Sequence, residues 1–276
     1  NRTRNKAKWQ NQPIIGVQNI NRRCDMQSIV KLLTILKKIN AGEALDKQEV
    51  LDLNGFGSMS FLLRDWDHVE NWGDAEKSSF KYMPQLKEQL RLFSDRKSIR
   101  YESIQQDMRN AVLSSYYTPP EIISALTTVL GTFPLKTGEK IKSILEPSAG
   151  SGRFLEPLHT QFPDASIVAI EKNSIAAVIA QEYGKQVSDQ VKLYNNVYEN
   201  LPYANKYDLI ISNIPFARIK VVDPQGPKSV QQFANSVHEF YFAKSLELLR
   251  PGGVLAFITT TGIMDNAVHS ALREHL

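Results

Sequence analysis

The sequence has one cysteine and no long hydrophobic run, and each absence excludes a class of protein. Cys24 is the single cysteine in 276 residues, so an internal disulfide and a cysteine-rich zinc site are both excluded. No stretch reaches the 18 or so apolar residues of a membrane-spanning helix, and no hydrophobic leader opens the chain. We therefore expect a cytoplasmic protein, in a reducing compartment and away from the membrane.

The sequence also shows none of the residue patterns that are typical of hydrolytic and metal-dependent enzymes. No paired carboxylates and no Ser/His/Asp set stand out, so we expect no bound metal. We interpret each histidine as a surface or packing residue. The scattered histidines are His68, His159, His238, His269 and His275.

The composition is that of a globular protein with an uneven charge. Hydrophobic residues make up 42% and charged residues 22%, and the net charge is +4. Residues 1–110 hold 19 Lys and Arg against 14 Asp and Glu, so the positive excess lies in this part. A basic region of this kind would suit the phosphates of a nucleic acid, although on charge alone a solvated helical face is the preferred interpretation.

The first 110 residues have helical periodicity. Apolar residues recur at helical spacing in 26–39, with Asp25 available as a cap, and again in 84–94 and 101–114. We expect an all-helical, basic domain over 1–110. We assign its tryptophans to packing roles, and these are Trp9, Trp66 and Trp72.

From about residue 115 short β-branched runs alternate with helical stretches. The predicted strands are 144–145, 167–170, 191–194, 209–212 and 254–259. The predicted helices between them are 153–160, 174–183 and 238–249. This alternation favours a doubly wound α/β domain over 111–276, with helices on both faces of a parallel sheet. Pro251-Gly252-Gly253 reads as a turn between the last helix and the last strand.

A glycine turn follows the first predicted strand. Gly150 and Gly152 remove side chains where the backbone must turn tightly, and the helix that follows offers free amide groups to a nucleotide-like ligand. About twenty residues later, Glu171 ends the second predicted strand and could accept hydrogen bonds from both hydroxyls of a ribose. Each signal is weak alone, because glycines and surface glutamates are common in such loops.

The fourth predicted strand ends in Asn213-Ile214-Pro215-Phe216. The Asn213 amide oxygen and the Ile214 carbonyl could accept the two hydrogens of an exocyclic amino group, which would favour a nitrogen lone pair able to attack a methyl group. The Phe216 ring could stack on the base that carries this group. A simple strand end is the alternative interpretation, since Asn and Pro are frequent there.

Taken in order, the motifs resemble a known family. Tyr116-Tyr117-Thr118-Pro119-Pro120-Glu121, the 146–152 loop, Glu171 and the 213–216 motif are similar to those of S-adenosylmethionine-dependent N(6)-adenine-specific DNA methyltransferases whose Thr-Pro motif comes first. Within this family the chain most resembles methylase domains of helicase/methylase proteins on Bacteroides-type mobile elements. The resemblance covers 115–265 and extends weakly to Gly55-Phe56-Gly57.

The resemblance implies a Rossmann-like class I methyltransferase sheet, S-adenosylmethionine as cofactor and DNA as partner. Asn213, Ile214, Pro215 and Phe216 would be catalytic, and a target adenine would flip into their pocket. The implied cofactor contacts are Tyr117, Thr118, Pro119, Glu146, Ser148, Ala149, Gly150, Gly152, Glu171 and Tyr198. Tyr198 belongs with Asn196 and Val197 to the stretch beside the cofactor's adenine, where relatives carry an acid. The family motif usually reads Asn-Pro-Pro-Phe, and Ile214 still supplies the main-chain carbonyl.

After the fifth strand the family fold requires two more strands and a target-recognition region. Only about 15 residues remain, so we expect C-terminal strands to be missing and the sequence to be a piece of a longer polypeptide. Two other functions stay open at this point. One is methylation of a glutamine amide in a protein, because such a planar amide would suit the same motif. The other is an inactive DNA-binding module of a larger helicase/methylase protein.

Overall fold

The computed structural model describes residues 26–53, 79–114, 117–132, 138–216 and 219–276, with position 135 and isolated positions between 55 and 77. Several predictions from the sequence fall outside these residues. They concern the basic segment 1–25 with Trp9 and the Asp25 cap, Gly57 and Tyr116.

The centre of the molecule is a five-stranded parallel sheet in the order β3-β2-β1-β4-β5. Its strands are β1 (Ser143–Glu146), β2 (Ser166–Glu171), β3 (Val191–Asn195), β4 (Tyr207–Asn213) and β5 (Leu249–Ile258). β1 lies between β2 and β4, with Ile144 opposite both Ile167 and Leu209. The predicted doubly wound parallel sheet is therefore confirmed, and β1, β2 and β4 end at one edge.

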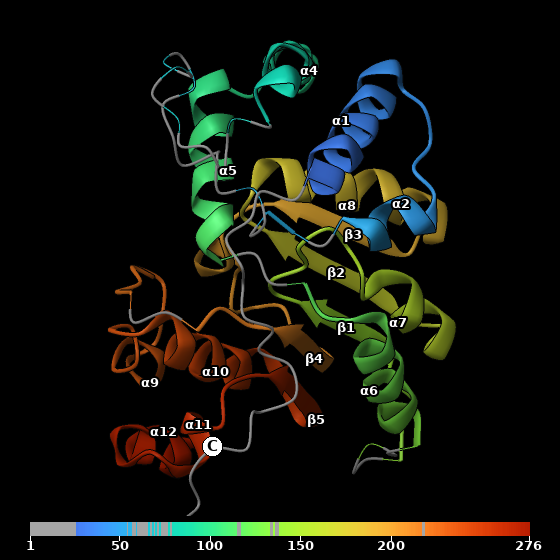
Figure 1. Ribbon diagram of the computed structural model, residues 1–276. Helices are drawn as coiled ribbons and strands as arrows, with labels where there is room; N and C mark the ends of the chain where they lie inside the picture. Colours follow the sequence, from blue (N-terminus) through green and yellow to red (C-terminus); the bar gives the residue numbers. More distant parts are fainter. Residues whose placement is uncertain are drawn as a thin grey trace, which may run out of the picture.

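Helices cover both faces of this sheet (Figure 1). One face carries α6 (Pro120–Thr132), α7 (Leu155–Gln161) and α8 (Ser174–Val187), and the other carries α10 (Val237–Leu248) with α9 (Lys228–Gln231) and α12 (Ser270–His275) against it. The short helix α11 (Gly262–Asp265) follows β5. Because side chains alternate along a strand, Ile144 packs toward α6 and α7, whereas Leu145 packs toward α10.

The N-terminal helices pack directly on the outer side of α8. They are α1 (Met26–Ala41), α2 (Lys47–Asp52), α4 (Met83–Lys97) and α5 (Tyr101–Ser114). They share one hydrophobic core with Ile175, Val178 and Tyr183 of α8. The first half of α8, residues 174–180, is buried throughout. A helical segment that is apolar on all sides needs cover on all sides, which the sheet and the N-terminal helices provide. Trp66 and Trp72 lie in this core as predicted.

Two features differ from the predicted organisation. α5 continues through position 110, where the boundary between the two domains was placed. The predicted turn at 251–253 is wrong, because β5 already begins at Leu249, which pairs with Tyr207. Gly252, with a φ of +82°, lies instead at an irregularity inside the strand, where Arg250 forms an ion pair with Asp208 at 2.9 Å.

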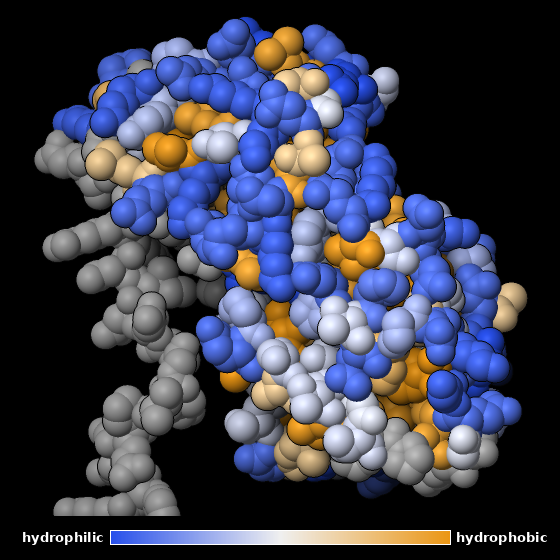
Figure 2. Space-filling view, turned by 90° about the vertical axis from the view of Figure 1, so that its right-hand side faces the viewer, coloured by the Kyte–Doolittle hydropathy of each residue, from blue (hydrophilic) through white to orange (hydrophobic). Residues whose placement is uncertain are grey.

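The surface is mainly polar on the face seen in Figure 2, where hydrophobic residues are scattered among hydrophilic ones. Among the described residues no helix combines the length and the apolar character needed to cross a bilayer.

Candidate active site

The loop between β1 and α7 depends on two glycines for its shape. Gly150 and Gly152 have φ angles of +56° and +91°, which residues with a Cβ rarely adopt. A Cβ at Gly150 would lie 2.9 Å from the Tyr117 ring, and a Cβ at Gly152 would lie 2.9 Å from Leu155 and 3.1 Å from Ala180. The glycines therefore allow the turn and also close packing of this loop, which we call the cofactor loop (147–154).

Glu171 lies at the cofactor loop. Its carboxylate accepts a 2.7 Å hydrogen bond from the Gly150 amide and another of 2.7 Å from the Asn173 amide. Burial raises the pKa of Glu171, and these amide bonds oppose the rise. A carboxylate has about four acceptor positions, so the two amide bonds leave capacity for a ribose diol. The structure thus brings together the two signals that the sequence separates by about twenty residues.

Glu146 is a buried acid at the end of β1. Its side chain is inaccessible to solvent, and neither carboxyl oxygen has a hydrogen-bond partner within the described part of the chain. Burial, with the nearby Glu171 charge, raises the pKa of Glu146 well above its usual range. Such a group is costly unless a ligand pairs with it. The cofactor's ammonium and ribose groups would supply partners for Glu146 and Glu171, so these residues fit S-adenosylmethionine.

The Thr-Pro segment lies across the cofactor loop. Tyr117 contacts Gly150, and burial, reinforced by Glu171, raises the pKa of this tyrosine. The Thr118 carbonyl accepts a 3.1 Å hydrogen bond from Arg153 of the cofactor loop. Pro119 precedes α6, and its carbonyl accepts hydrogen bonds from backbone amides in the first turn of that helix. The 117–119 segment and the cofactor loop are therefore one assembly, although 27 or more residues separate them.

The 213–216 motif lies next to the cofactor loop because β1 and β4 are neighbours in the sheet. The Ser212 hydroxyl donates a 3.2 Å hydrogen bond to the Ser148 carbonyl, which joins the end of β4 to the loop. Asn213 is the last residue of β4, and Ile214 is buried with its amide bonded to the Ile258 carbonyl at 3.4 Å. The structure therefore puts the predicted methyl-acceptor motif beside the predicted cofactor site.

Phe216, after the end of β4, is 45% exposed. Its ring meets the ring of His238, at the start of α10, edge to face at a centroid distance of 5.7 Å. His238 is itself buried and bonds Thr259 after β5. The Phe216 side chain is thus in contact with a buried histidine and also partly accessible to solvent.

Tyr198, a predicted cofactor contact, has its side chain in the core. It begins the short 3-10 helix η4 (Tyr198–Asn200) and is 1% exposed, with its hydroxyl bonded to Ser245 at 2.8 Å and its ring 4.7 Å from that of Tyr241. The side chain belongs to the core under α10, because η4 turns it inward. In this stretch Asn196 is exposed beside the end of β2, and its backbone amide donates a hydrogen bond to the Glu171 carbonyl.

Two residues at this site were not identified from the sequence. Arg153 is buried and bonds both the Thr-Pro segment and α2. An arginine in a loop of small residues is a signal that could have been noticed. His238 was assigned a surface or packing role, and it is a packing residue, but its position under Phe216 follows only from the fold.

The known proteins to which this chain is similar include several methyltransferases. No family model matches the chain. The type II methyltransferase M.XamI of Xanthomonas campestris pv. amaranthicola is 30% identical over 176 residues, covering 58% of this chain and 32% of that protein. Modification methylase CviBIII of Paramecium bursaria Chlorella virus NC1A is 31% identical over 137 residues, or 48% and 34% of the two chains. The chain thus matches about a third of the length of each relative.

A release factor glutamine methyltransferase of Geobacter sulfurreducens is 27% identical over 140 residues, covering 47% of this chain and 49% of that protein. Among solved structures, the type I restriction-modification system methyltransferase subunit from Streptococcus thermophilus superposes with a TM-score of 0.49 at 11% identity, over 89% of this chain and 58% of that chain. The parallel sheet and the methyltransferase relatives together confirm two predictions from the sequence, the class I methyltransferase fold and S-adenosylmethionine as the cofactor.

Proposed function

We propose that the chain is the methyltransferase domain of an adenine-specific DNA methyltransferase. It would transfer a methyl group from S-adenosylmethionine to the exocyclic amino group of an adenine flipped out of the duplex. The observation that carries the proposal is the adjacency of the 213–216 motif to the cofactor loop, through the Ser212–Ser148 hydrogen bond. The relatives named as a type II methyltransferase and a modification methylase support a DNA substrate.

The cofactor supplies an electrophilic methyl group when bound, and the chain's residues bind and orient the reactants. Glu146 and Glu171 would hold the amino-acid and ribose parts, and the 117–119 segment would border them. Glu146 ends β1 and Asn213 ends the neighbouring strand β4. The proposed methyl-donor and methyl-acceptor sites would therefore lie at the same edge of the sheet.

The Asn213 side-chain oxygen and the Ile214 carbonyl would accept the two amino hydrogens of adenine. These bonds would direct the nitrogen lone pair at the methyl carbon. The N–C bond would form as the sulfur–methyl bond breaks, which leaves a neutral thioether, and one amino proton would then pass to water. The exposed Phe216 ring would stack on the flipped base, and its contribution offsets part of the few kcal/mol that flipping costs.

Methylation of a glutamine amide is the second candidate. The similarity to a release factor glutamine methyltransferase favours it, since a side-chain amide presents the same planar NH₂ group as adenine. Both reactions would use Asn213 and Ile214 in the same way, so the acceptor distinguishes them and the motif does not.

The test is transfer of tritium from methyl-labelled S-adenosylmethionine to duplex DNA or to a protein acceptor containing exposed glutamines. We expect label in DNA, and label in protein alone would favour the second candidate. Asn213→Ala should abolish transfer while its cofactor affinity, measured by calorimetry, stays near that of the wild type. Asn110→Ala, which changes an exposed amide on α5, is the matched control and should stay active. A wild-type protein that binds the cofactor without transferring label to either acceptor would indicate an inactive module.

A further inference from the structure

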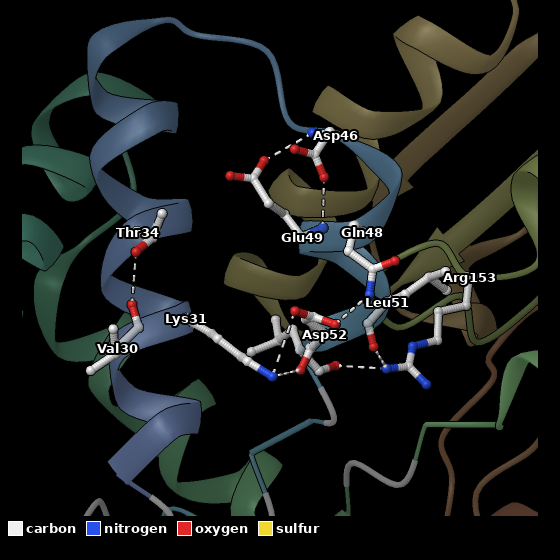
Figure 3. A network of polar contacts seen from close by, with 10 residues as sticks. Val30, Lys31, Thr34, Asp46, Gln48, Glu49, Leu51, Asp52 and Arg153 are labelled. Atoms are coloured by element: carbon white, nitrogen blue, oxygen red, sulfur yellow. Dashed lines mark hydrogen bonds and ion pairs between the residues drawn. The ribbon is translucent and has the colours of Figure 1, made fainter.

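Arg153 of the cofactor loop is anchored in the N-terminal helices. Its side chain is buried, and its guanidinium donates hydrogen bonds to the carbonyls of Leu51 and Leu53, the latter at 3.2 Å. Both carbonyls lie at the end of α2, more than 90 residues earlier in the chain. Figure 3 shows the guanidinium reaching this helix end from the loop.

The end of α2 is a favourable place for a cation. The last carbonyls of a helix have no partner inside the helix, and the helix dipole puts partial negative charge there. Arg153 satisfies two of these carbonyls with a planar group whose donors point in fixed directions. Lys31 of α1 meets the same helix end from the other side, where its ammonium lies 3.4 Å from the Asp52 carbonyl (Figure 3).

The same guanidinium holds the Thr-Pro segment. It donates a 3.1 Å hydrogen bond to the Thr118 carbonyl and lies 5.4 Å from the centre of the Tyr117 ring. That ring occupies the space where a side chain at position 150 would be, and the Gly150 amide is in turn bonded to Glu171. A continuous series of contacts therefore runs from α2 through Arg153 and Tyr117 to the predicted ribose acceptor.

We propose that Arg153 is a positioning residue for the cofactor site, through which α2 holds the Thr-Pro segment against the cofactor loop. The N-terminal helices are then part of the cofactor-binding unit, in addition to covering α8. Arg153 acts through Tyr117 and Gly150. This inference rests on the proposed cofactor role of the 117–119 segment and the loop.

The experiment compares Arg153→Met, Arg153→Lys and Lys31→Met in the whole chain. Lys31→Met is the matched control, because Lys31 also binds the end of α2, through the carbonyl and the carboxylate of Asp52, but does so from α1 and not from the cofactor loop. We expect Arg153→Met to weaken S-adenosylmethionine binding about tenfold by calorimetry, the factor that corresponds to one charge-assisted hydrogen bond of about 1.4 kcal/mol. Arg153→Lys should retain part of the affinity, and Lys31→Met should bind as the wild type does.

Steady-state kinetics separate positioning from general structural damage. The proposal predicts a higher KM for S-adenosylmethionine in Arg153→Met, with kcat at saturating cofactor and KM for DNA nearly unchanged. Cofactor binding equal to the wild type in a folded Arg153→Met would overturn it. Equal losses in Arg153→Met and Lys31→Met, or failure of both Arg153 variants to fold, would also overturn it in favour of a purely structural role. A wild-type protein that binds no S-adenosylmethionine would instead remove the proposed function, and this inference with it.

Discussion

A buried ion pair between α10 and the segment that follows Phe216 allows a quantitative test of the packing. Lys244 of α10 has a fully buried side chain, and its ammonium donates to Asp223 at 2.9 Å and to the Glu199 carbonyl at 2.8 Å. Asp223 also accepts a 2.6 Å hydrogen bond from Tyr203. It belongs to the segment that follows Phe216, so the pair ties this segment to α10 and to η4.

Lys244→Met should be strongly destabilising because it leaves the Asp223 carboxylate, whose side chain is 2% exposed, without its counter-ion. Removal of one partner from a buried pair costs about 3 to 5 kcal/mol, and the remaining Tyr203 bond puts the expected loss near 3 kcal/mol. Urea unfolding measures it through a lower midpoint at constant slope.

The double variant Lys244→Met with Asp223→Leu should recover much of the loss, since no uncompensated charge remains. Lys140→Met is the control, because its ion pair with Asp164 is long at 3.9 Å and exposed, and it should change little. A Lys244→Met protein within about 1 kcal/mol of the wild type would refute the argument that this pair is dry and tightly coupled.

Three further predictions concern the site. Glu171→Ala should raise the Kd for S-adenosylmethionine about tenfold or more, and unchanged affinity in calorimetry would remove Glu171 from the site. Because the pKa of Glu146 is raised in the folded state, its protonated form stabilises the fold at low pH, and this contribution is lost as the pH rises above the ordinary value near 4.5. Glu146→Gln should therefore gain stability over the wild type as the pH increases in thermal melts, yet bind the cationic cofactor more weakly; parallel stability curves would contradict this. Phe216→Ala should raise KM for DNA roughly tenfold or more through lost stacking without altering cofactor affinity, and an unchanged KM for DNA would exclude a stacking role.

The sheet and the clustered motifs could be predicted because strong local patterns determine them. The β-branched runs predict the five strands to within a few residues. The exception is the start of β5, where Arg250 pairs with Asp208 of the neighbouring strand β4. Parallel strands end at one edge, so Gly150, Glu171 and Asn213 could be expected at the same edge of the sheet. The strand order that makes β1 the neighbour of both β2 and β4 came only from the structure. The helix α6 was not predicted, although its buried positions Ile123, Thr127 and Leu130 are spaced by three or four residues.

The remainder could not be predicted, because it depends on contacts between segments far apart in the sequence. The burial of α8 on its outer side requires the N-terminal helices, and Arg153 has a role only once α2 lies beside the loop. Tyr198 was assigned to the cofactor by the family resemblance, and its burial against Ser245 and Tyr241 of α10 follows only from the fold. In each case the deciding partner lies at least 40 residues away.

The central claim is that the 213–216 motif orients an adenine so that its amino nitrogen accepts a methyl group from S-adenosylmethionine. The most direct measurement is mass spectrometry of nucleosides from DNA incubated with the protein and deuterium-labelled S-adenosylmethionine. We expect labelled N6-methyladenine with the wild type and none with Asn213→Ala. Label in N4-methylcytosine or 5-methylcytosine, or N6-methyladenine that persists in Asn213→Ala, would contradict it.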